Sequence, residues 1–247
     1  MATEFFRTTA GGRIPAVTAA QMEEIDRIAL DETGPNLFQM MENAGRNLAM
    51  AVLERLGTHR KDVIVLAGTG NNGGGGICAA RHLANRGVAV TLVMSDATLL
   101  GDVASQQLAV YRQTPGKEAA PADVDQVAGH LVIDALIGYR LDGPARGSVA
   151  HIMGAVDTTD AFVIALDVPS GLDATTGEPT GPFIPADLTV TVALPKTGLD
   201  APGCGLIELS DIGIPSEVYR RAGIAVPAGS FGMGYRIRIT PEPPVLA

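Results

Sequence analysis

The chain has 247 residues, of which 46% are hydrophobic and 18% are charged, and its formal net charge is −9. This composition is typical of a globular protein rather than a disordered one, and the acidic excess argues against duplex DNA or an anionic membrane as a partner. No apolar stretch approaches the roughly 20 residues of a membrane span. The two cysteines, Cys78 and Cys204, are too few for a disulfide framework, and the N-terminus lacks the pattern of a secretory signal, so we expect a cytoplasmic protein.

Two amphipathic helices are predicted near the N-terminus. Thr18 and Gln21 have the spacing of a capping box, and apolar residues then recur on one helical face until Gly34 ends the segment. Asn36 and Gln39 repeat the capping pattern before a longer segment with a broad apolar stripe. The stripe predicts that this second helix packs on the core.

After residue 62 the sequence alternates between short apolar runs and helical segments. The apolar runs are nearly continuous, which is typical of parallel strands covered on both faces. The alternation therefore predicts a doubly wound α/β sandwich. Strands are expected at 63–67, 88–94, 131–136, 162–168, 188–194 and 206–209, and helices at 77–86, about 102–113, about 121–129 and 147–158.

The chain shows no linker, repeat or low-complexity segment that would divide it. We therefore expect a single domain over residues 1–247, with a C-terminal extension at 216–247. The final segment, RIRITPEPPVLA, is expected to add an edge strand or to wrap over the surface, because its prolines argue against a central strand.

The most distinctive stretch is VIVLAGTGNNGGGG, which runs from Val63 to Gly76. A strand, six glycines and then a helix predict a loop whose backbone amides approach a ligand at a helix N-terminus, where phosphates bind well. A tight turn alone needs roughly two or three glycines. The stretch is not a Walker loop, because no Lys-Ser or Lys-Thr follows the glycines. We therefore predict a ligand-binding loop.

Polar residues follow several of the predicted strands, and ligands of such sheets bind outside the carboxyl ends of the strands. Asp134 lies within an apolar run, where a carboxylate needs a partner or a raised pKa. Asp167 ends a similar run and Ser170 follows it in a sharp turn, while Lys196 follows the next strand. We predict functional roles for Asp134 and Asp167, with a cap or turn role as the alternative for each.

Other chemistries find less support in the sequence. Gly68 to Gly73 match G-x-G-x-x-G and Asp96 stands where a ribose-binding acid belongs, but no Tyr-x-x-x-Lys or similar hydride-transfer set accompanies them. Ser170 is not in a G-x-S-x-G elbow, and neither cysteine has a sequence-local base. The four histidines lack metal spacing and are expected to be surface or packing residues: His59, His82, His130 and His151.

Seven segments, taken together, carry a family resemblance. They are MENAGRNLA, AGTGNNGGGG, AARHL, DALIGYRLDG, ALDVPSGLDATTG, ADLTVTVALPKTGL and LSDIGIP. In these motifs and their order the chain resembles the YjeF N-terminal family, across a core of about residues 15–215. The resemblance implies a Rossmann-like three-layer α/β/α sandwich with a mostly parallel sheet and two N-terminal helices, which often mediate a homodimer.

The best-known members of this family are NAD(P)H-hydrate epimerases. The resemblance therefore implies an isomerase that interconverts the R and S epimers of hydrated NADH or NADPH in nicotinamide-nucleotide repair, with a potassium ion in the site. A separate dehydratase would act on the product, because the dehydratase domain of bifunctional members would not fit in this chain. The alternative is a diverged, non-epimerase member that binds or converts another nucleotide-like ligand.

The family motifs also assign residues. Asn72, Asp134 and Ser170 would coordinate potassium; their oxygen atoms suit a hard cation. Epimerisation needs a proton donor and acceptor, and we expect Asp167 in this catalytic role with Asp134 anchoring the cation. The implied substrate-binding residues are Asn71, Asn72, Gly73, Gly74, Gly75, Gly138, Tyr139, Arg140, Leu141, Asp142, Gly143, Pro144 and Asp167.

The chain departs from the family pattern at two places. The family usually reads N-N-G-G-D-G in the glycine stretch, and Gly75 stands here in place of the acid. Tyr139 and Arg140 stand where the family commonly has Thr and Gly, and the guanidinium of Arg140 could hold a phosphate or another anion. Gly75 favours the alternative of binding without turnover, whereas Asn71, Asn72, Asp134, Asp167 and Ser170 favour the epimerase.

Overall fold

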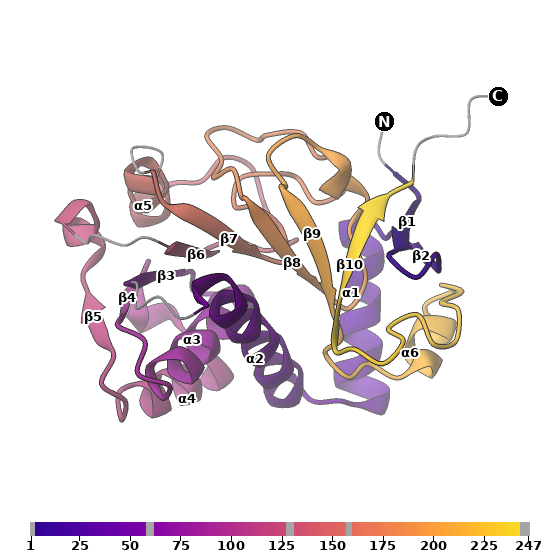
Figure 1. The fold of residues 1–247 in the computed structure, drawn as a ribbon, viewed down its shortest axis with the longest axis horizontal. Coiled ribbons are helices and arrows are strands. Elements are labelled where there is room, and N and C mark those ends of the chain that lie inside the picture. Colours follow the sequence, from indigo (N-terminus) through magenta and orange to yellow (C-terminus); the bar gives the residue numbers. More distant parts are fainter. Residues whose placement is uncertain (1–2, 58–61, 127–130, 157–159, 243–247) are drawn as a thin grey trace.

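The computed structural model describes residues 3–57, 62–126, 131–156 and 160–242. Within these residues ten strands form one sheet in the order β2-β1-β10-β9-β8-β7-β6-β3-β4-β5 (Figure 1). The strands are β1 (Phe5–Thr8), β2 (Arg13–Pro15), β3 (Val63–Ala67), β4 (Val90–Met94), β5 (Lys117–Ala119), β6 (Leu131–Ala135), β7 (Phe162–Leu166), β8 (Leu188–Val192), β9 (Leu206–Ser210) and β10 (Arg236–Pro241). The helices are α1 (Ala19–Ile28), α2 (Leu37–Leu56), α3 (Asn71–Ala84), α4 (Asp102–Tyr111), α5 (Gly147–Val156) and α6 (Ser216–Arg221).

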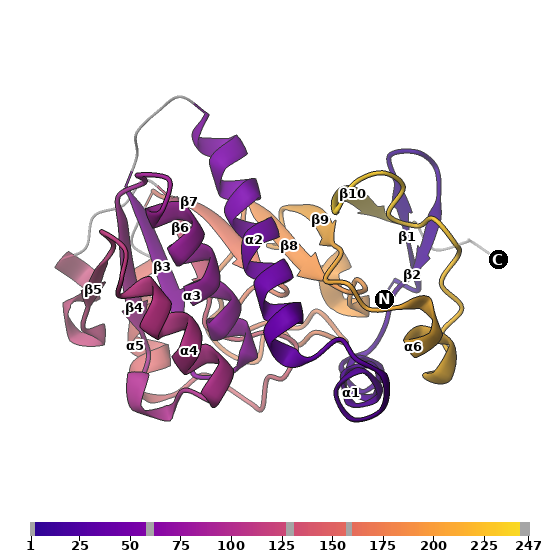
Figure 2. The same ribbon diagram turned by 90° about the horizontal axis from the view of Figure 1, so that it is seen from below.

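The strands from β9 to β5 in this order pair in parallel, and β10, β1 and β2 add antiparallel pairs. Helices α2, α3 and α4 cover one face of the parallel part, and α5 lies on the other (Figures 1 and 2). Apolar side chains fill both interfaces between helices and sheet. The predicted three-layer α/β/α sandwich with a mostly parallel sheet is confirmed.

The N-terminal helices begin where the capping patterns predict. The Thr18 side chain accepts a hydrogen bond from the Gln21 N–H and the Gln21 side chain accepts one from the Thr18 N–H, and Asn36 and Gln39 form the same pair of bonds at α2. After α1 the chain makes a π-helical turn at Ala29–Thr33 before the second cap. None of the helices in the described part of the chain has the length and apolar character of a membrane span.

All six predicted strands are present, but three of them end earlier than their apolar runs. The residues after β6, β7 and β8 leave the sheet and form loops, although Leu136, Val168 and Leu194 are still buried. These side chains are apolar because the loops pack inward, and not because they continue the strands. The three loops carry several of the predicted site residues.

The prediction for the C-terminal tail was wrong. β10 pairs with β9 on one side and with β1 on the other, so it is not an edge strand. Its single proline, Pro241, is the last residue of the strand, where a missing N–H disturbs the pairing least. β1, β2 and β5 were not predicted, because each has only three or four residues. Residues 127–129 and 157–158 of two expected helices, and 243–247 of the tail, lie outside the described residues.

Candidate active site

A cavity of about 610 Å³ opens at the carboxyl ends of β3, β6 and β7, between these strand ends and helices α1 and α2. This volume is typical of a small-molecule site, and its position is where doubly wound sheets bind ligands. Most of the predicted substrate residues line it: Asn71, Asn72, Gly75, Gly138, Tyr139, Arg140, Leu141, Asp142, Gly143, Pro144 and Asp167.

The glycine stretch is a helix rather than the predicted loop. α3 begins at Asn71, so the four consecutive glycines from Gly73 to Gly76 occupy its first turns. Gly70 is the N-cap and has no side chain to accept a bond from the first amides of the helix. Gly70 and Asn71 both line the cavity, so the N-terminus of α3 lies at its wall. The anion-binding end of a helix is therefore part of the site.

The number of glycines is explained by packing. A Cβ atom at Gly73 would lie 1.9 Å from the carbonyl oxygen of Gly68, and one at Gly76 would lie 2.6 Å from Cβ of Ala135 on β6. At Gly74 the neighbour would be the end of the Met41 side chain, at 2.5 Å. Gly73 and Gly74 do not line the cavity. Most of the glycines are present because α3 lies very close to the sheet and to α2.

Gly75 differs from its neighbours because it lines the cavity. A Cβ atom there would lie 2.8 Å from Cδ2 of Leu166, the last residue of β7, which Asp167 follows. Any side chain at position 75 would therefore be directed towards the end of β7.

Asp134 and Ser170 form a buried pair beneath the cavity. Ser170 donates from its hydroxyl to Asp134 Oδ1 at 2.6 Å and from its backbone N–H to Oδ2 at 2.8 Å. The Ser170 hydroxyl also accepts a bond from the Ile137 N–H at 2.9 Å. Burial raises the pKa of Asp134 to about 6, although the bonds from Ser170 and Leu136 act in the opposite direction. The pair fixes the loop after β6 to the turn after β7.

Asp167 forms a buried ion pair with Lys196, whose ammonium lies against Oδ1. The same oxygen accepts bonds from the Thr191 hydroxyl at 3.2 Å and the Val192 N–H at 3.3 Å. All three contacts use Oδ1, and Asp167 lines the cavity. Asp167 also has a φ of 71°, a left-handed conformation that is uncommon for a residue other than glycine and is often found at functional sites.

Two polar residues of this site were not predicted to be functional. The sequence indicates only that Lys196 follows a strand, whereas the structure buries it fully against Asp167. Asp26 of α1 lines the cavity and accepts a bond of 2.6 Å from the Tyr139 hydroxyl. The signal for Asp26 is an acidic residue directly after the buried Ile25 of an amphipathic helix, and this signal alone is weak.

Asp96, the acid of the dehydrogenase alternative, does not line this cavity. Its carboxylate accepts bonds from the Thr98 N–H and hydroxyl, at 2.9 and 2.6 Å, and caps a short 3₁₀ turn. It lines a smaller, separate hollow at the ends of β4 and β5. The geometry gives Asp96 a capping role.

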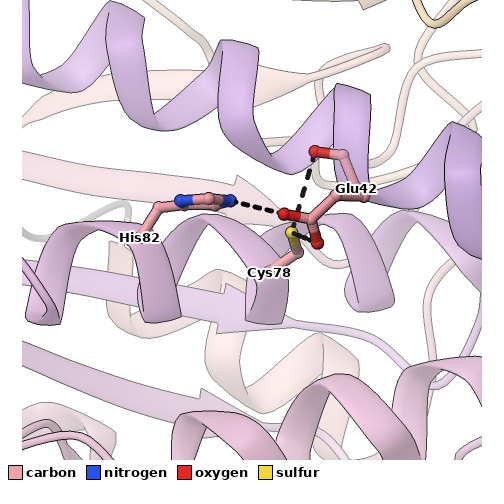
Figure 3. A group of neighbouring side chains, drawn as sticks. All are labelled: Glu42, Cys78 and His82. Atoms are coloured by element: carbon pink, nitrogen blue, oxygen red, sulfur yellow. Dashed lines mark hydrogen bonds and ion pairs between the residues drawn. The ribbon is translucent and has the colours of Figure 1, made fainter.

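A second polar cluster joins α2 to α3, where Glu42 faces Cys78 and His82 (Figure 3). His82 Nε2 lies 2.8 Å from Glu42 Oε1, and Cys78 Sγ lies 3.3 Å from Oε2. His82 therefore packs between α2 and α3, and a cysteine and a carboxylate that the sequence spacing did not indicate accompany it. His59 and His130 lie outside the described residues.

The guanidinium of Arg81 supplies the positive charge of this cluster. It lies 2.5 Å from Glu42 Oε2, 3.3 Å from His82 Nε2 and 3.5 Å from Cys78 Sγ. Burial raises the pKa of Glu42, but the bonds from Arg81, His82 and Cys78 outweigh it and lower that pKa to about 2. Burial also raises the pKa of Cys78 to about 12, which keeps the thiol protonated. The Arg81 guanidinium already neutralises Glu42 and the cysteine is not a thiolate, so the cluster joins α2 and α3 through polar contacts.

The fold and this site define a doubly wound α/β protein with a nucleotide-type cavity at its strand ends. The chain belongs to the family described as YjeF-related protein N-terminus, which it matches over residues 37–198. It is 46% identical to an NAD(P)H-hydrate epimerase of Dehalogenimonas lykanthroporepellens over 95% of this chain and 97% of that protein.

A longer relative supports the family assignment, and a solved structure supports the fold. The chain is 37% identical to a bifunctional NAD(P)H-hydrate repair enzyme Nnr of Moorella thermoacetica, over 82% of this chain but only 41% of that enzyme. The crystal structure of the yeast protein ynu0 matches 91% of this chain and all of that chain with a TM-score of 0.80 at 22% identity, which supports the fold.

Proposed function

We propose that this protein is an NAD(P)H-hydrate epimerase, an isomerase that interconverts the R and S epimers of hydrated NADH and NADPH. The observation that carries the proposal is the cavity, which combines an uncapped helix N-terminus at Gly70 with the buried Asp167–Lys196 pair. The first feature suits a pyrophosphate and the second suits proton transfer. The similarity to proteins named as epimerases supports the same reaction.

The helix N-terminus would hold the substrate's phosphates. The N–H groups of Asn71 and Asn72 are the first of α3 and have no partners one turn earlier in the helix, and both residues line the cavity. Arg140 and Arg146 line the same cavity and add positive charge. Loop residues Gly138 to Pro144 would enclose the rest of the nucleotide, with the Tyr139 ring as an apolar wall.

Asp167 would act at the hydrated ring. Inverting the carbinol carbon requires either loss and return of its hydroxyl or opening and closure of the ring, and both routes need proton transfer. Oδ2 of Asp167 would exchange the proton while Oδ1 holds Lys196. Lys196 balances the buried charge of Asp167 and fixes its orientation.

The family resemblance implies a potassium ion, and the donor set fits one. Asp134 and Ser170 offer a carboxylate and a hydroxyl, the oxygen donors that hard cations prefer. The Asn72 side chain lies against Gly138, and its Oδ1 would be the third oxygen ligand. Asn72, Asp134 and Ser170 would hold the ion. Its charge would offset the Asp134 carboxylate and steady the loop after β6.

The same reasoning extends to partners. Leu30, Phe38 and Met50 are large apolar side chains exposed on the N-terminal helical region, which supports a homodimer through α1 and α2. A separate dehydratase would consume the epimer that this chain forms. Both cysteines, Cys78 and Cys204, are free and buried, which supports a cytoplasmic location.

The test is a direct assay of epimerisation. Purified protein is mixed with the R epimer of hydrated NADH, with and without potassium chloride, and the two epimers are separated chromatographically over time. We expect a rate that is proportional to enzyme concentration, and we expect Asp167→Asn to lower it at least about 100-fold. No acceleration at high enzyme concentration would favour the alternative suggested by Gly75, a family member that binds a nucleotide without turnover.

A further inference from the structure

Asp26 places a second carboxylate in the cavity. It lies on α1, whose buried face carries Met22 and Ile25, and it lines the same cavity as Asp167. Asp26 lies outside the residues that match the family and carries no role in the mechanism described so far. Since epimerisation needs both a proton donor and a proton acceptor, a second carboxyl group in the cavity is significant.

Tyr139 connects the two carboxylates. Its hydroxyl donates to Asp26 Oδ2 at 2.6 Å and accepts from Arg140 Nε at 3.1 Å. The Tyr139 ring centroid lies 5.8 Å from the Lys196 ammonium, which is paired with Asp167. Asp26, Tyr139 and Asp167 thus line one cavity, with Lys196 buried behind Asp167 and near the Tyr139 ring.

The two carboxylates have different surroundings. Asp167 lies directly against an ammonium, whereas the direct partner of Asp26 is a neutral phenol. Burial raises the pKa of Asp26; the Tyr139 bond and the charges of Lys196 and Arg140 lower it, and the charge of Asp167 raises it. Among the described residues, Tyr219 of α6 also interacts with Asp26. A carboxylate paired with an ammonium is suited to accept a proton, and a buried carboxyl group whose direct partner is a neutral phenol is suited to donate one.

We propose that Asp26, held by Tyr139, is the proton-donating catalytic residue of the epimerisation and that Asp167 is the proton acceptor. This inference rests on the proposed function. The carboxylic acid of Asp26 gives its proton to the departing hydroxyl as the carbon–oxygen bond breaks, and the ring nitrogen lone pair forms an iminium ion. Water then adds to the opposite face, and Asp167 takes its proton. No oxidant or reductant is consumed, and solvent returns the two carboxyls to their starting states.

The experiment compares four proteins across pH: wild type, Asp26→Asn, Tyr139→Phe and the control Glu24→Gln. Glu24 is also a carboxylate on α1, but it is exposed and paired with Arg27 away from the cavity. We expect Asp26→Asn to lower kcat about 100-fold with KM within about threefold, because a positioned acid contributes 10²–10⁴-fold. We expect Glu24→Gln to leave both constants unchanged.

The pH profile separates catalysis from a structural role. The acid acts only when protonated, so the rate falls as pH rises through the pKa of Asp26. The bond from Tyr139 lowers that pKa, and its loss in Tyr139→Phe should therefore move the alkaline limb to higher pH. If Asp26→Asn keeps kcat within threefold, or if Tyr139→Phe leaves the limb in place, the inference fails. An inactive wild type would instead overturn the proposed function itself.

Discussion

The buried ion pair between Asp167 and Lys196 allows the most quantitative prediction. The two side chains are 3% and 0% exposed, so neither charge is solvated by water. Removing one partner of a buried pair costs about 3–5 kcal/mol, because the other charge is left without a counterion. In Lys196→Met the Asp167 carboxylate would retain the Thr191 hydroxyl and the Val192 N–H. We therefore expect Lys196→Met to lower the free energy of unfolding by about 3 kcal/mol, the lower limit of this range.

A double variant measures the coupling free energy between Asp167 and Lys196. Asp167→Asn leaves the Lys196 ammonium with the Val192 carbonyl at 2.9 Å as a neutral acceptor, and a loss of about 3 kcal/mol is again expected. Asp167→Asn combined with Lys196→Met removes both charges, so no lone charge remains. We expect it to lower the free energy of unfolding by no more than either single variant, at most about 3 kcal/mol, rather than by the sum of the two single losses, which gives a coupling free energy of at least about 3 kcal/mol.

The assay is equilibrium urea unfolding at neutral pH, followed by circular dichroism. Glu217→Gln is the matched control, because Glu217 pairs with Arg220 on the exposed surface of α6 and should change stability by less than about 0.5 kcal/mol. A coupling below about 0.5 kcal/mol between the two site residues would show that their charges are independent. The assignment of Lys196 as the counterion that positions Asp167 would then be wrong.

Three further variants test other parts of the account. Gly75→Asp places Cβ 2.8 Å from the flexible end of Leu166 and should lower the free energy of unfolding by about 1–3 kcal/mol in a urea titration. The epimerisation rate should stay within tenfold of wild type, and a hundredfold gain would show that the natural site lacks its acid. Glu42→Gln leaves the mostly buried Arg81 without its carboxylate and should lower the free energy of unfolding by about 1–2 kcal/mol at pH 7, after allowance for solvent exposure. Since the pKa of Glu42 is lowered to about 2, this difference from wild type should shrink between pH 4.5 and pH 2. A constant difference would show that the Glu42 carboxylate does not stabilise the contact between α2 and α3. For the wild type, the Tm in potassium chloride should be higher than the Tm in tetramethylammonium chloride at equal ionic strength. For Asp134→Asn, the two salts should give the same Tm, and an equal rise in the two proteins would exclude Asp134 as a potassium ligand.

The alternation of apolar runs and helical segments was sufficient to predict the sandwich, because strands that are buried on both faces consist of nearly continuous apolar residues. It could not predict β10, whose central place depends on β1, a strand from the other end of the chain. Such long-range pairing has no local signal. The three-residue strands β2 and β5 are likewise stabilised by their neighbours rather than by their own residues.

The glycine stretch shows the limit of local reasoning about a site. The sequence correctly indicated a close backbone approach, but not which neighbour approaches. Gly73 and Gly76 meet the protein itself, whereas Gly70 and Gly75 face the cavity. Asp26 and Lys196 were missed as site residues for a related reason, since their importance arises from Tyr139 and Asp167, which are distant from them in the chain.

The central claim, that this cavity epimerises a hydrated nicotinamide nucleotide, is tested most directly by starting from each epimer separately. Pure R and pure S hydrated NADH are incubated with the wild-type protein, and the ratio of epimers is followed to equilibrium. We predict that both solutions converge on the same ratio at rates proportional to enzyme concentration, and that Asp167→Asn abolishes this dependence. Convergence at the spontaneous rate, whatever the enzyme concentration, would contradict the claim.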